Sequence, residues 1–249
     1  MHLGALFAAA SFAAFAAFAQ QPSAPPTVDQ LVARHIDARG GYQKLKAIQT
    51  IRITRTVATA FSDIRVVVSK KRPNLYRGEQ GPLKSTAPLV PRAVNQDGAW
   101  DTGAGGKPVM RSTAATAETR DLDGDFDGLL VDWKEKGHSV TADGAEKLPS
   151  GDTYKLKVKM KSGAERTIYL DAATYLERRH IGVLNLPDGR VFNTVIDFGN
   201  YREVDGVKFA HDITEERTGK EPVQSLVTYT EKIELNVPMG DAIFAPPAK

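Results

Sequence analysis

Cysteine is absent from all 249 residues of the chain, and that absence removes several classes of protein at once. Without a thiol there are no disulfides, no thiolate nucleophile and no cysteine-ligated metal site. There is also no lipobox cysteine, so we do not expect the protein itself to be anchored as a lipoprotein. A secreted domain of this size without disulfides has to be held together by the burial of apolar side chains.

An excess of charge of one sign is lacking as well. The 33 Lys and Arg residues nearly balance the 30 Asp and Glu residues, and neither sign forms a long block. A strongly basic face is the usual mark of a nucleic-acid-binding protein. We therefore expect no nucleic-acid partner.

Motifs that carry catalysis are also missing. The sequence has no Gly-x-Ser-x-Gly elbow, no Ser-x-x-Lys pair, no His-Glu-x-x-His helix and no glycine-rich phosphate loop. The histidines at positions 35, 138, 180 and 211 lie far apart, without the spacing of metal ligands. These absences predict a protein that is not an enzyme and uses neither a metal nor a cofactor. A hydrolase that brings two carboxylates together after folding is the alternative.

The first stretch of the chain contains no Asp, Glu, Lys or Arg. Residues 1–18 are mostly Ala, Phe and Leu, and Ala17-Phe18-Ala19 has the small-x-small pattern that a signal peptidase accepts. The apolar stretch is shorter than the roughly 20 residues that a membrane-spanning helix needs. We predict a cleaved signal peptide over residues 1–19 and a location in the periplasm. A proline-rich linker at 20–26 and a single domain at 27–249 follow.

Two helices are predicted at the start of this domain. Thr27 is placed as an N-cap with Gln30 at the capping-box position, and Gly40-Gly41 ends the helix. A second, short helix is expected at 42–48. One stripe of the first helix is apolar and consists of Val28, Leu31, Val32 and Ile36.

After residue 50 the helical period gives way to the alternation of strands. In the clearest strand, Tyr154, Leu156, Val158 and Met160 point one way, and lysines 155, 157, 159 and 161 point the other. Further strands are predicted at 51–57, 64–69, 166–170, 175–183, 191–198, 207–214 and 226–235. Short polar turns such as Asp205-Gly206 join them, which favours an antiparallel meander.

We predict an α+β fold with one strongly curved antiparallel sheet, a half-barrel, whose concave face is plugged by the N-terminal helices. The sheet has to cover its apolar face, and the helix pair is the only sizeable amphipathic partner. The region 80–120 is rich in Gly, Pro, Thr and Ala. A lid, a mobile loop and long hairpin connections are all compatible with that composition.

An acidic segment at 121–128 has the spacing of part of a calcium-binding loop. Asp123, Asp125 and Asp127 occupy loop positions one, three and five, but Lys134 stands at position twelve, where a bidentate Glu belongs. These residues favour a solvated acidic turn, with a weak calcium site as the alternative.

Several motifs along the chain resemble the LolA-like periplasmic lipoprotein-carrier and outer-membrane lipoprotein-sorting proteins, in their uncharacterised branch. The early ones are Ala38-Arg39-Gly40-Gly41 with Lys44-Leu45 and Ile48, then Lys71-Arg72-Pro73-Asn74. The later ones are Phe126 to His138, Tyr154 to Val158, Ile168 to Asp171, Thr174 to Leu176, Tyr201 to Phe209, and Leu235 to Pro238 before Phe244 and Pro246. Together they extend over nearly all of the predicted domain.

The resemblance implies a half-barrel with an apolar cavity between its helices and its sheet, which in the transport members receives acyl chains. It also implies that Phe126-Asp127-Gly128 is part of a family pattern and not a metal loop. The polar residue that closes the lid of the true carriers has no matching position here.

We therefore expect a monomeric carrier or binding protein for an acyl-chain ligand, such as a lipoprotein or another lipid, that takes part in lipoprotein sorting to the outer membrane and is at most peripheral to the membrane. An envelope sensor or scaffold that binds a protein partner without carrying lipid is the alternative. The candidate lining residues are Leu31 and Ile36 on the helix, and Ile51, Ile53, Val66, Val68, Tyr154, Leu156, Val158 and Met160 on the sheet.

Overall fold

The computed structural model describes residues 25–186 and 188–247. The signal peptide predicted at 1–19 and the linker up to residue 24 lie outside the described residues. No helix among the described residues is long and apolar enough to cross a membrane.

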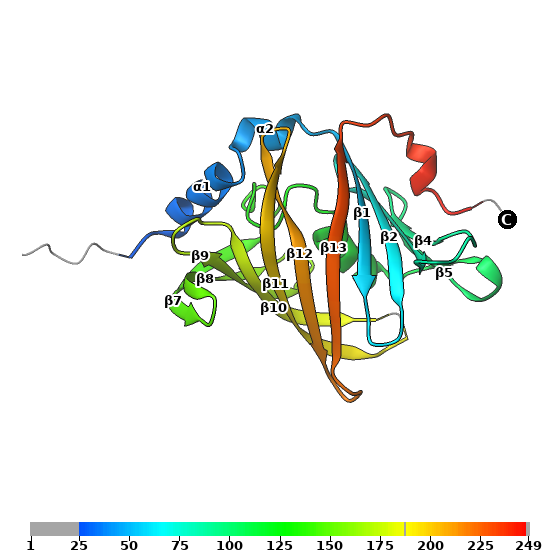
Figure 1. Cartoon of the computed structure of the whole chain (residues 1–249). Coiled ribbons are helices and arrows are strands. Elements are labelled where there is room, and N and C mark those ends of the chain that lie inside the picture. The colour runs from blue at the N-terminus through cyan, green and yellow to red at the C-terminus, as the bar shows by residue number, and fades with distance from the viewer. Residues whose placement is uncertain (1–24, 187, 248–249) are drawn as a thin grey trace, which may run out of the picture.

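The predicted curved antiparallel sheet is confirmed (Figure 1). Within the described residues it has 13 strands in the order β6-β5-β4-β3-β2-β1-β13-β12-β11-β10-β9-β8-β7, and it does not close into a barrel because β6 and β7 form its two edges. The strands are β1 (Thr50–Ala58), β2 (Asp63–Lys71), β3 (Leu75–Pro82), β4 (Val90–Val94), β5 (Ala99–Thr102), β6 (Pro108–Met110), β7 (Ser139–Leu148), β8 (Gly151–Lys159), β9 (Glu165–Asp171), β10 (Glu177–Asn185), β11 (Val191–Val204), β12 (Val207–Thr218) and β13 (Gln224–Leu235).

The order of the strands divides the sheet into two meanders. Strands β1 to β6 run outward in one direction, β7 to β13 run back from the opposite edge, and the pairing of β1 with β13 joins the two runs. The segment 111–138 carries the chain from β6 to β7, so it has to pass from one edge of the sheet to the other. That crossing places a long connection on the concave side (Figure 1).

The N-terminal helices form as predicted, and they lie at one end of the concave side (Figure 1). Helix α1 (Val28–Ala38) begins with a complete capping box between Thr27 and Gln30, and Gly40 and Gly41 follow it at positive φ. Its buried residues are Leu31, Val32 and His35. Helix α2 (Tyr42–Ala47) follows directly and buries Leu45.

The region 80–120 forms short strands, turns and one short helix. It contains the end of β3, the strands β4, β5 and β6, the 3-10 turn η1 (Ala104–Gly106) and helix α3 (Thr113–Thr119). Of the alternatives compatible with its composition, hairpin connections within the sheet describe it best, since β3 pairs with β4, β4 with β5 and β5 with β6.

The prediction that the acidic segment 121–128 is a solvated turn is wrong. A short π-helical turn, η2 (Arg120–Gly124), leads into it, and side chains of Asp125 and Asp127 are only 5 % and 4 % exposed. Three apolar residues follow at once, Leu129, Leu130 and Val131, with exposures of 7 %, 0 % and 0 %. Apolar burial on one side and ion pairing on the other hold this segment inside the fold.

The C-terminal segment packs on the opposite face of the sheet. There the short helix η3 (Asp241–Phe244) covers β3 to β5, and the Trp100 Nε1–H donates a hydrogen bond to the Phe244 carbonyl at 3.2 Å. Arg77 Nη1 donates to the Ile243 carbonyl at 2.7 Å. Trp100 and Phe244 are 1 % and 0 % exposed, so this outer layer is a second, smaller core.

Candidate functional site

The register of the strands divides the candidate lining residues into two groups on the concave face. Ile51, Ile53, Val66 and Val68 belong to one apolar cluster, together with Tyr76, Val94 and Ala99. Tyr154, Leu156, Val158 and Met160 belong to another, which also contains Leu31 and has Ile36 packed against it. The fold brings helix and sheet candidates together at the second cluster, whereas the first faces a different part of the connection.

Residues 126–131 fill the space between these clusters, and we call them the plug segment. Leu129 and Leu130 pack into the cluster of β8 and β9, and Phe126 packs against the cluster of β1 and β2. Val131 joins a third cluster with Leu45 of helix α2. The plug segment therefore packs against both groups of candidate lining residues and against helix α2.

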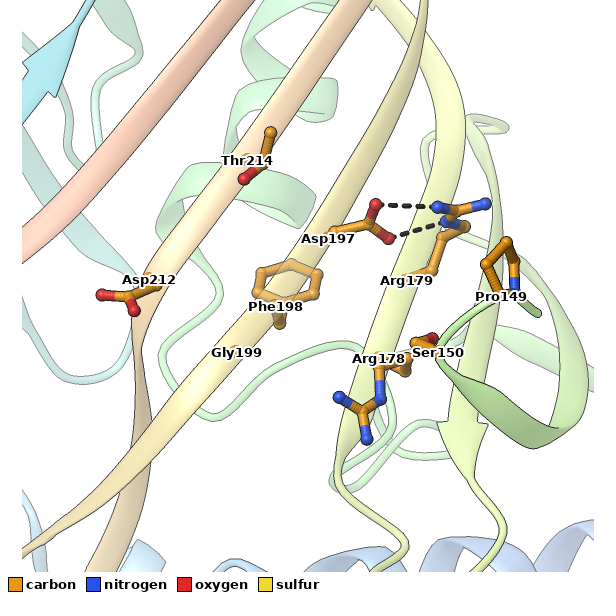
Figure 2. A pocket seen from close by; sticks show the side chains of 9 residues that line it. All are labelled: Pro149, Ser150, Arg178, Arg179, Asp197, Phe198, Gly199, Asp212 and Thr214. Carbon is orange, nitrogen blue, oxygen red and sulfur yellow. Dashed lines mark hydrogen bonds and ion pairs between the residues drawn. The ribbon is translucent and has the colours of Figure 1, made fainter.

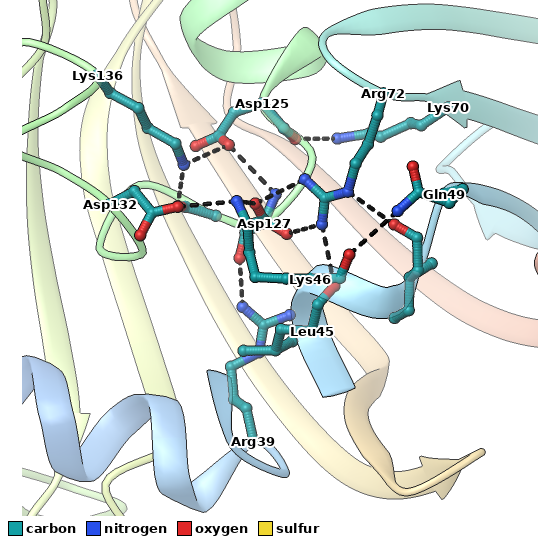
Figure 3. A network of polar contacts seen from close by, with 12 residues as sticks. Arg39, Leu45, Lys46, Gln49, Lys70, Arg72, Asp125, Asp127, Asp132 and Lys136 are labelled. Atoms are coloured by element: carbon teal, nitrogen blue, oxygen red, sulfur yellow. Dashed lines mark hydrogen bonds and ion pairs between the residues drawn. The ribbon is translucent and has the colours of Figure 1, made fainter. Parts of the chain in front are cut away.

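A network of charged side chains holds the plug segment from its polar side (Figure 3). The Asp127 carboxylate accepts hydrogen bonds from Arg72 Nη1 at 2.9 Å, from Arg72 Nη2 at 2.5 Å and from Lys46 Nζ at 3.0 Å. Lys46 also donates to Asp132 at 2.8 Å, and Arg39 donates to the Asp127 carbonyl. Burial alone would raise the pKa of Asp127, but these hydrogen bonds and positive charges lower it.

The neighbouring Asp125 completes this network. Its carboxylate accepts a hydrogen bond from Lys136 Nζ at 2.6 Å, and its carbonyl accepts one from Lys70 Nζ at 2.7 Å. Burial lowers the pKa of Lys70, and the charge of Asp125 opposes that effect. Among the described residues no group of His, Asp and Glu side chains is placed to hold a metal ion. The acids of this segment are paired with lysine and arginine.

One cation on the concave face lacks such a partner. Arg55 stands on β1 between Val66 of β2 and Thr230 of β13. Its Nε is shielded from solvent and has no hydrogen-bond partner among the described residues, and the same holds for the Thr230 Oγ1. Burial lowers the pKa of Arg55, and the nearby Tyr76 hydroxyl acts in the opposite direction. The sequence carried a signal for this site, because Arg55 breaks the apolar alternation of its strand.

A cavity of about 140 Å³ lies on the same face and is bordered by Val66, the cross-strand neighbour of Arg55. It is lined by residues of strands β2, β3, β4 and β5, among them Val66, Tyr76, Arg92 and the acids Glu79 and Asp101. The Arg92 Nη2 donates a hydrogen bond to the Tyr76 hydroxyl at 3.1 Å. Of the candidate lining residues, Val66 is the one that borders this cavity.

Two larger hollows lie on the outer face of the sheet, away from the candidates. One, of about 330 Å³, is lined by residues of β10, β11 and β12 (Figure 2). Its Arg179 forms two hydrogen bonds with Asp197, both at 2.7 Å, and Arg178 pairs with Asp171. The other, of about 440 Å³, is lined by Arg52, Val67 and neighbours. Open, polar and internally paired surfaces of this kind do not suit an apolar chain.

Two of the histidines meet inside the fold, which their spacing in the sequence did not reveal. His35 of α1 and His180 of β10 lie 3.9 and 3.5 Å from the Glu177 carboxylate. Burial lowers the pKa of His35, and the two histidines together with Arg39 lower that of Glu177 against the effect of its own burial. His35 Nδ1 also lies 3.0 Å from the Tyr175 carbonyl. These contacts fasten helix α1 to the sheet.

The fold is similar to those of several solved structures. A LolA superfamily protein from Nitrosomonas europaea superposes with a TM-score of 0.60 at 13 % identity, covering 89 % of this chain and 98 % of that one. A domain assigned to the outer membrane lipoprotein-sorting proteins of Vibrio parahaemolyticus gives 0.58 at 13 % identity, with 88 % and 95 % covered. A DUF1329 family protein from Desulfovibrio piger gives 0.54 at 14 % identity, with 89 % and 98 % covered.

In sequence alone, no protein-family model and no curated protein matches the chain. The likeness therefore rests on the three-dimensional arrangement, which extends over nearly nine tenths of the chain in each superposition. The protein has a LolA-like fold.

Proposed function

We propose that this protein is a periplasmic, non-enzymatic binding protein for an acyl-chain ligand, exported by the signal peptide at 1–19 and acting as one domain over 27–249. The ligand lies between the helices and the curved sheet, against the ten candidate lining residues. The plug segment occupies that space in the empty protein and leaves it when the ligand enters. Transfer of lipoproteins toward the outer membrane is the process that this activity serves.

The observation that carries this proposal is the construction of the plug segment. Its apolar side fills the concave face with Phe126, Leu129, Leu130 and Val131, while its polar side is held by ion pairs at Asp127. A segment of this kind covers an apolar surface that an acyl chain would cover equally well. Each methylene that a lipid buries there contributes about 0.8 kcal/mol. In a carrier, the plug segment and the ligand have to replace each other, because an empty apolar cavity would destabilise the protein.

We infer that the ligand enters at the end of the sheet opposite the helices. The hairpins β1–β2, β10–β11 and β12–β13 extend to the end of the sheet opposite the helices (Figure 1). Phe61 at the tip of the first hairpin is 99 % exposed, and Val223 in the third is 67 % exposed. Apolar side chains at this rim would meet a lipid surface before the interior does.

The second candidate function is an envelope module that binds a protein partner and carries no lipid. The close packing of Leu130, Leu156 and Ile168, each 0 % exposed, favours it, because a permanently filled interior has no room for a ligand. The two functions differ in whether the concave face can be emptied.

Adjacent residues on β2 give a matched test of the carrier function. Val66 faces the 140 Å³ cavity on the concave side, and Val67 faces the outer surface; both are half-buried. Purified wild type, Val66→Trp and Val67→Trp are titrated with cis-parinaric acid, whose fluorescence rises in an apolar site. We expect the wild type and Val67→Trp to bind alike, and Val66→Trp to bind at least tenfold more weakly because the indole occupies the cavity.

Circular dichroism and melting curves establish that both variants are folded. No fluorescence change with the wild type would overturn the carrier function and favour the protein-binding module. Equal binding by the wild type and both variants would place the ligand elsewhere than on this face.

A further inference from the structure

Arg55 and Thr230 each have a buried polar atom that lacks a hydrogen-bond partner within the described residues. They stand opposite each other on β1 and β13. Neither the Arg55 Nε nor the Thr230 Oγ1 has a hydrogen-bond partner in the described part of the chain, although both atoms are shielded from solvent. A buried polar group without a partner is destabilising, so two of them side by side call for an explanation.

The other cations in this part of the fold have acidic residues as partners. Arg92 lies 3.5 Å from Asp123, and Arg111 pairs with Asp101 at 2.7 Å. Lys70 and Lys136 share Asp125, as Figure 3 shows in part. Each of these cations has an acidic residue or its carbonyl as a partner.

Arg55 differs from all of them. Its Nε is shielded from solvent and has no hydrogen-bond partner within 25–186 and 188–247. The Tyr76 hydroxyl beside it accepts a hydrogen bond from Arg92 and keeps its own proton free to donate. Thr230 therefore offers a donor beside Arg55 on β13, and Tyr76 offers one on the side of β3. The acids that line the neighbouring cavity, Glu79 and Asp101, are paired with Arg77 and Arg111.

Space for an acceptor lies next to these donors. The 140 Å³ cavity is bounded by Tyr76 and by Val66, the residue that pairs with Arg55 across β1 and β2. Its volume has room for several water molecules, and hence for a carboxylate or a phosphate group. Apolar residues of the same face, Ile53 and Val68, continue from it toward the helices.

We propose that Arg55, with Thr230 and Tyr76, binds the negatively charged headgroup of an acyl-chain ligand, so that the protein selects anionic amphiphiles over neutral ones. This inference rests on the proposed acyl-chain binding and adds the headgroup to it. The guanidinium and the two hydroxyls donate charge-assisted hydrogen bonds to the headgroup oxygens. The chain of the ligand then runs along the apolar face from Val66 toward Ile53.

The test compares three probes by calorimetric titration of the mature protein: oleate, monoolein and acetate. Oleate and monoolein carry the same chain with a charged and a neutral headgroup, and acetate carries the charge without the chain. We expect oleate to bind at least tenfold more tightly than monoolein, since a hydrogen bond to a charged group is worth that much or more. Acetate should show no measurable binding in the same concentration range.

Two pairs of variants assign the preference to this site. Arg55→Leu should bind monoolein as the wild type does and lose the preference for oleate, while Arg52→Leu, on the outer face of the same strand, should retain it. Val66→Asp places a carboxylate opposite Arg55, so it should raise the melting temperature of the empty protein and also remove the preference. Its control is Val67→Asp, which should do neither.

The possible results distinguish a failure of the headgroup site from a failure of acyl-chain binding. Equal affinities for oleate and monoolein, or a preference that survives in Arg55→Leu and Val66→Asp, overturn the headgroup site and leave acyl-chain binding intact. Acetate binding as tight as oleate would make Arg55 a site for small anions and overturn the lipid headgroup. Binding of neither amphiphile overturns this inference together with the proposed function.

Discussion

Replacing Asp127 with asparagine tests whether charged side chains hold the plug segment in place. The substitution keeps the size of the side chain and removes the charge that Arg72 and Lys46 contact. Asp127 is 4 % exposed, whereas Arg72 and Lys46 are 17 % and 33 % exposed. Breaking a fully buried ion pair costs about 3–5 kcal/mol, and the partial exposure of both cations reduces that cost.

Contacts that remain in the variant reduce the cost further. Arg72 retains hydrogen bonds to the Leu45 and Ile48 carbonyls, and Lys46 retains Asp132. We therefore expect Asp127→Asn to lose roughly 2–3 kcal/mol of unfolding free energy. For a domain of this size that corresponds to a fall in melting temperature of about 4–12 °C. Thermal unfolding followed by circular dichroism at pH 7.5 measures the shift.

The matched control is Asp188→Asn at the turn between β10 and β11. Asp188 pairs with Arg190 at 2.7 Å, but these side chains are 53 % and 48 % exposed, so we expect no measurable change in melting temperature. The weakened plug of Asp127→Asn should also admit cis-parinaric acid faster than the wild type does. If the two asparagine variants melt alike, the ion pairs do not hold the plug segment and the reasoning is refuted.

Two further predictions concern stability. Burial lowers the pKa of His138 below 6.5, and its Nδ1 accepts a hydrogen bond from the Lys161 N–H. As the pH falls, the unfolded state therefore takes up a proton before the folded state does, and the stability of the protein should fall below about pH 6.5. A melting temperature that depends equally on pH in His138→Gln would contradict this. Gly40→Ala should melt well below the wild type, because a Cβ at this residue, whose φ is +123°, would lie 2.1 Å from the Gly206 carbonyl oxygen. Its control is Gly144→Ala, at φ +84° with open space around the Cβ, which should lower the melting temperature much less. Equal melting temperatures of the two variants would show that the contact at Gly40 is not close in solution.

The regular parts of the fold followed from local patterns in the sequence. Thr27 and Gln30 specified the start of α1, and the alternation from Tyr154 to Met160 specified β8. These signals are local because a capping box and a strand face are set by residues close in sequence. The strands β4 to β6 were missed because they are only 5, 4 and 3 residues long and two of them contain a proline.

The candidate site was harder to predict from local sequence patterns. The alternation along the strands placed Ile53, Val66 and Leu156 on apolar strand faces, but it gave no sign that they belong to two clusters with a plug segment between them. Asp127 looked solvated because its partners Lys46 and Arg72 lie 81 and 55 residues away. Pairings over such separations depend on how the sheet curves, which no local period encodes. The run Leu129-Leu130-Val131 after the acids was the available signal that this segment is buried.

The most direct test of acyl-chain binding is organic extraction and mass spectrometry of the mature protein purified from a periplasm, alongside Val66→Trp and Val67→Trp prepared in the same way. We expect the wild type and Val67→Trp to retain about one lipid per protein molecule, and a folded Val66→Trp to retain much less. A stable wild-type protein that is free of lipid would contradict the carrier function and leave the protein-binding module as the function that the fold serves.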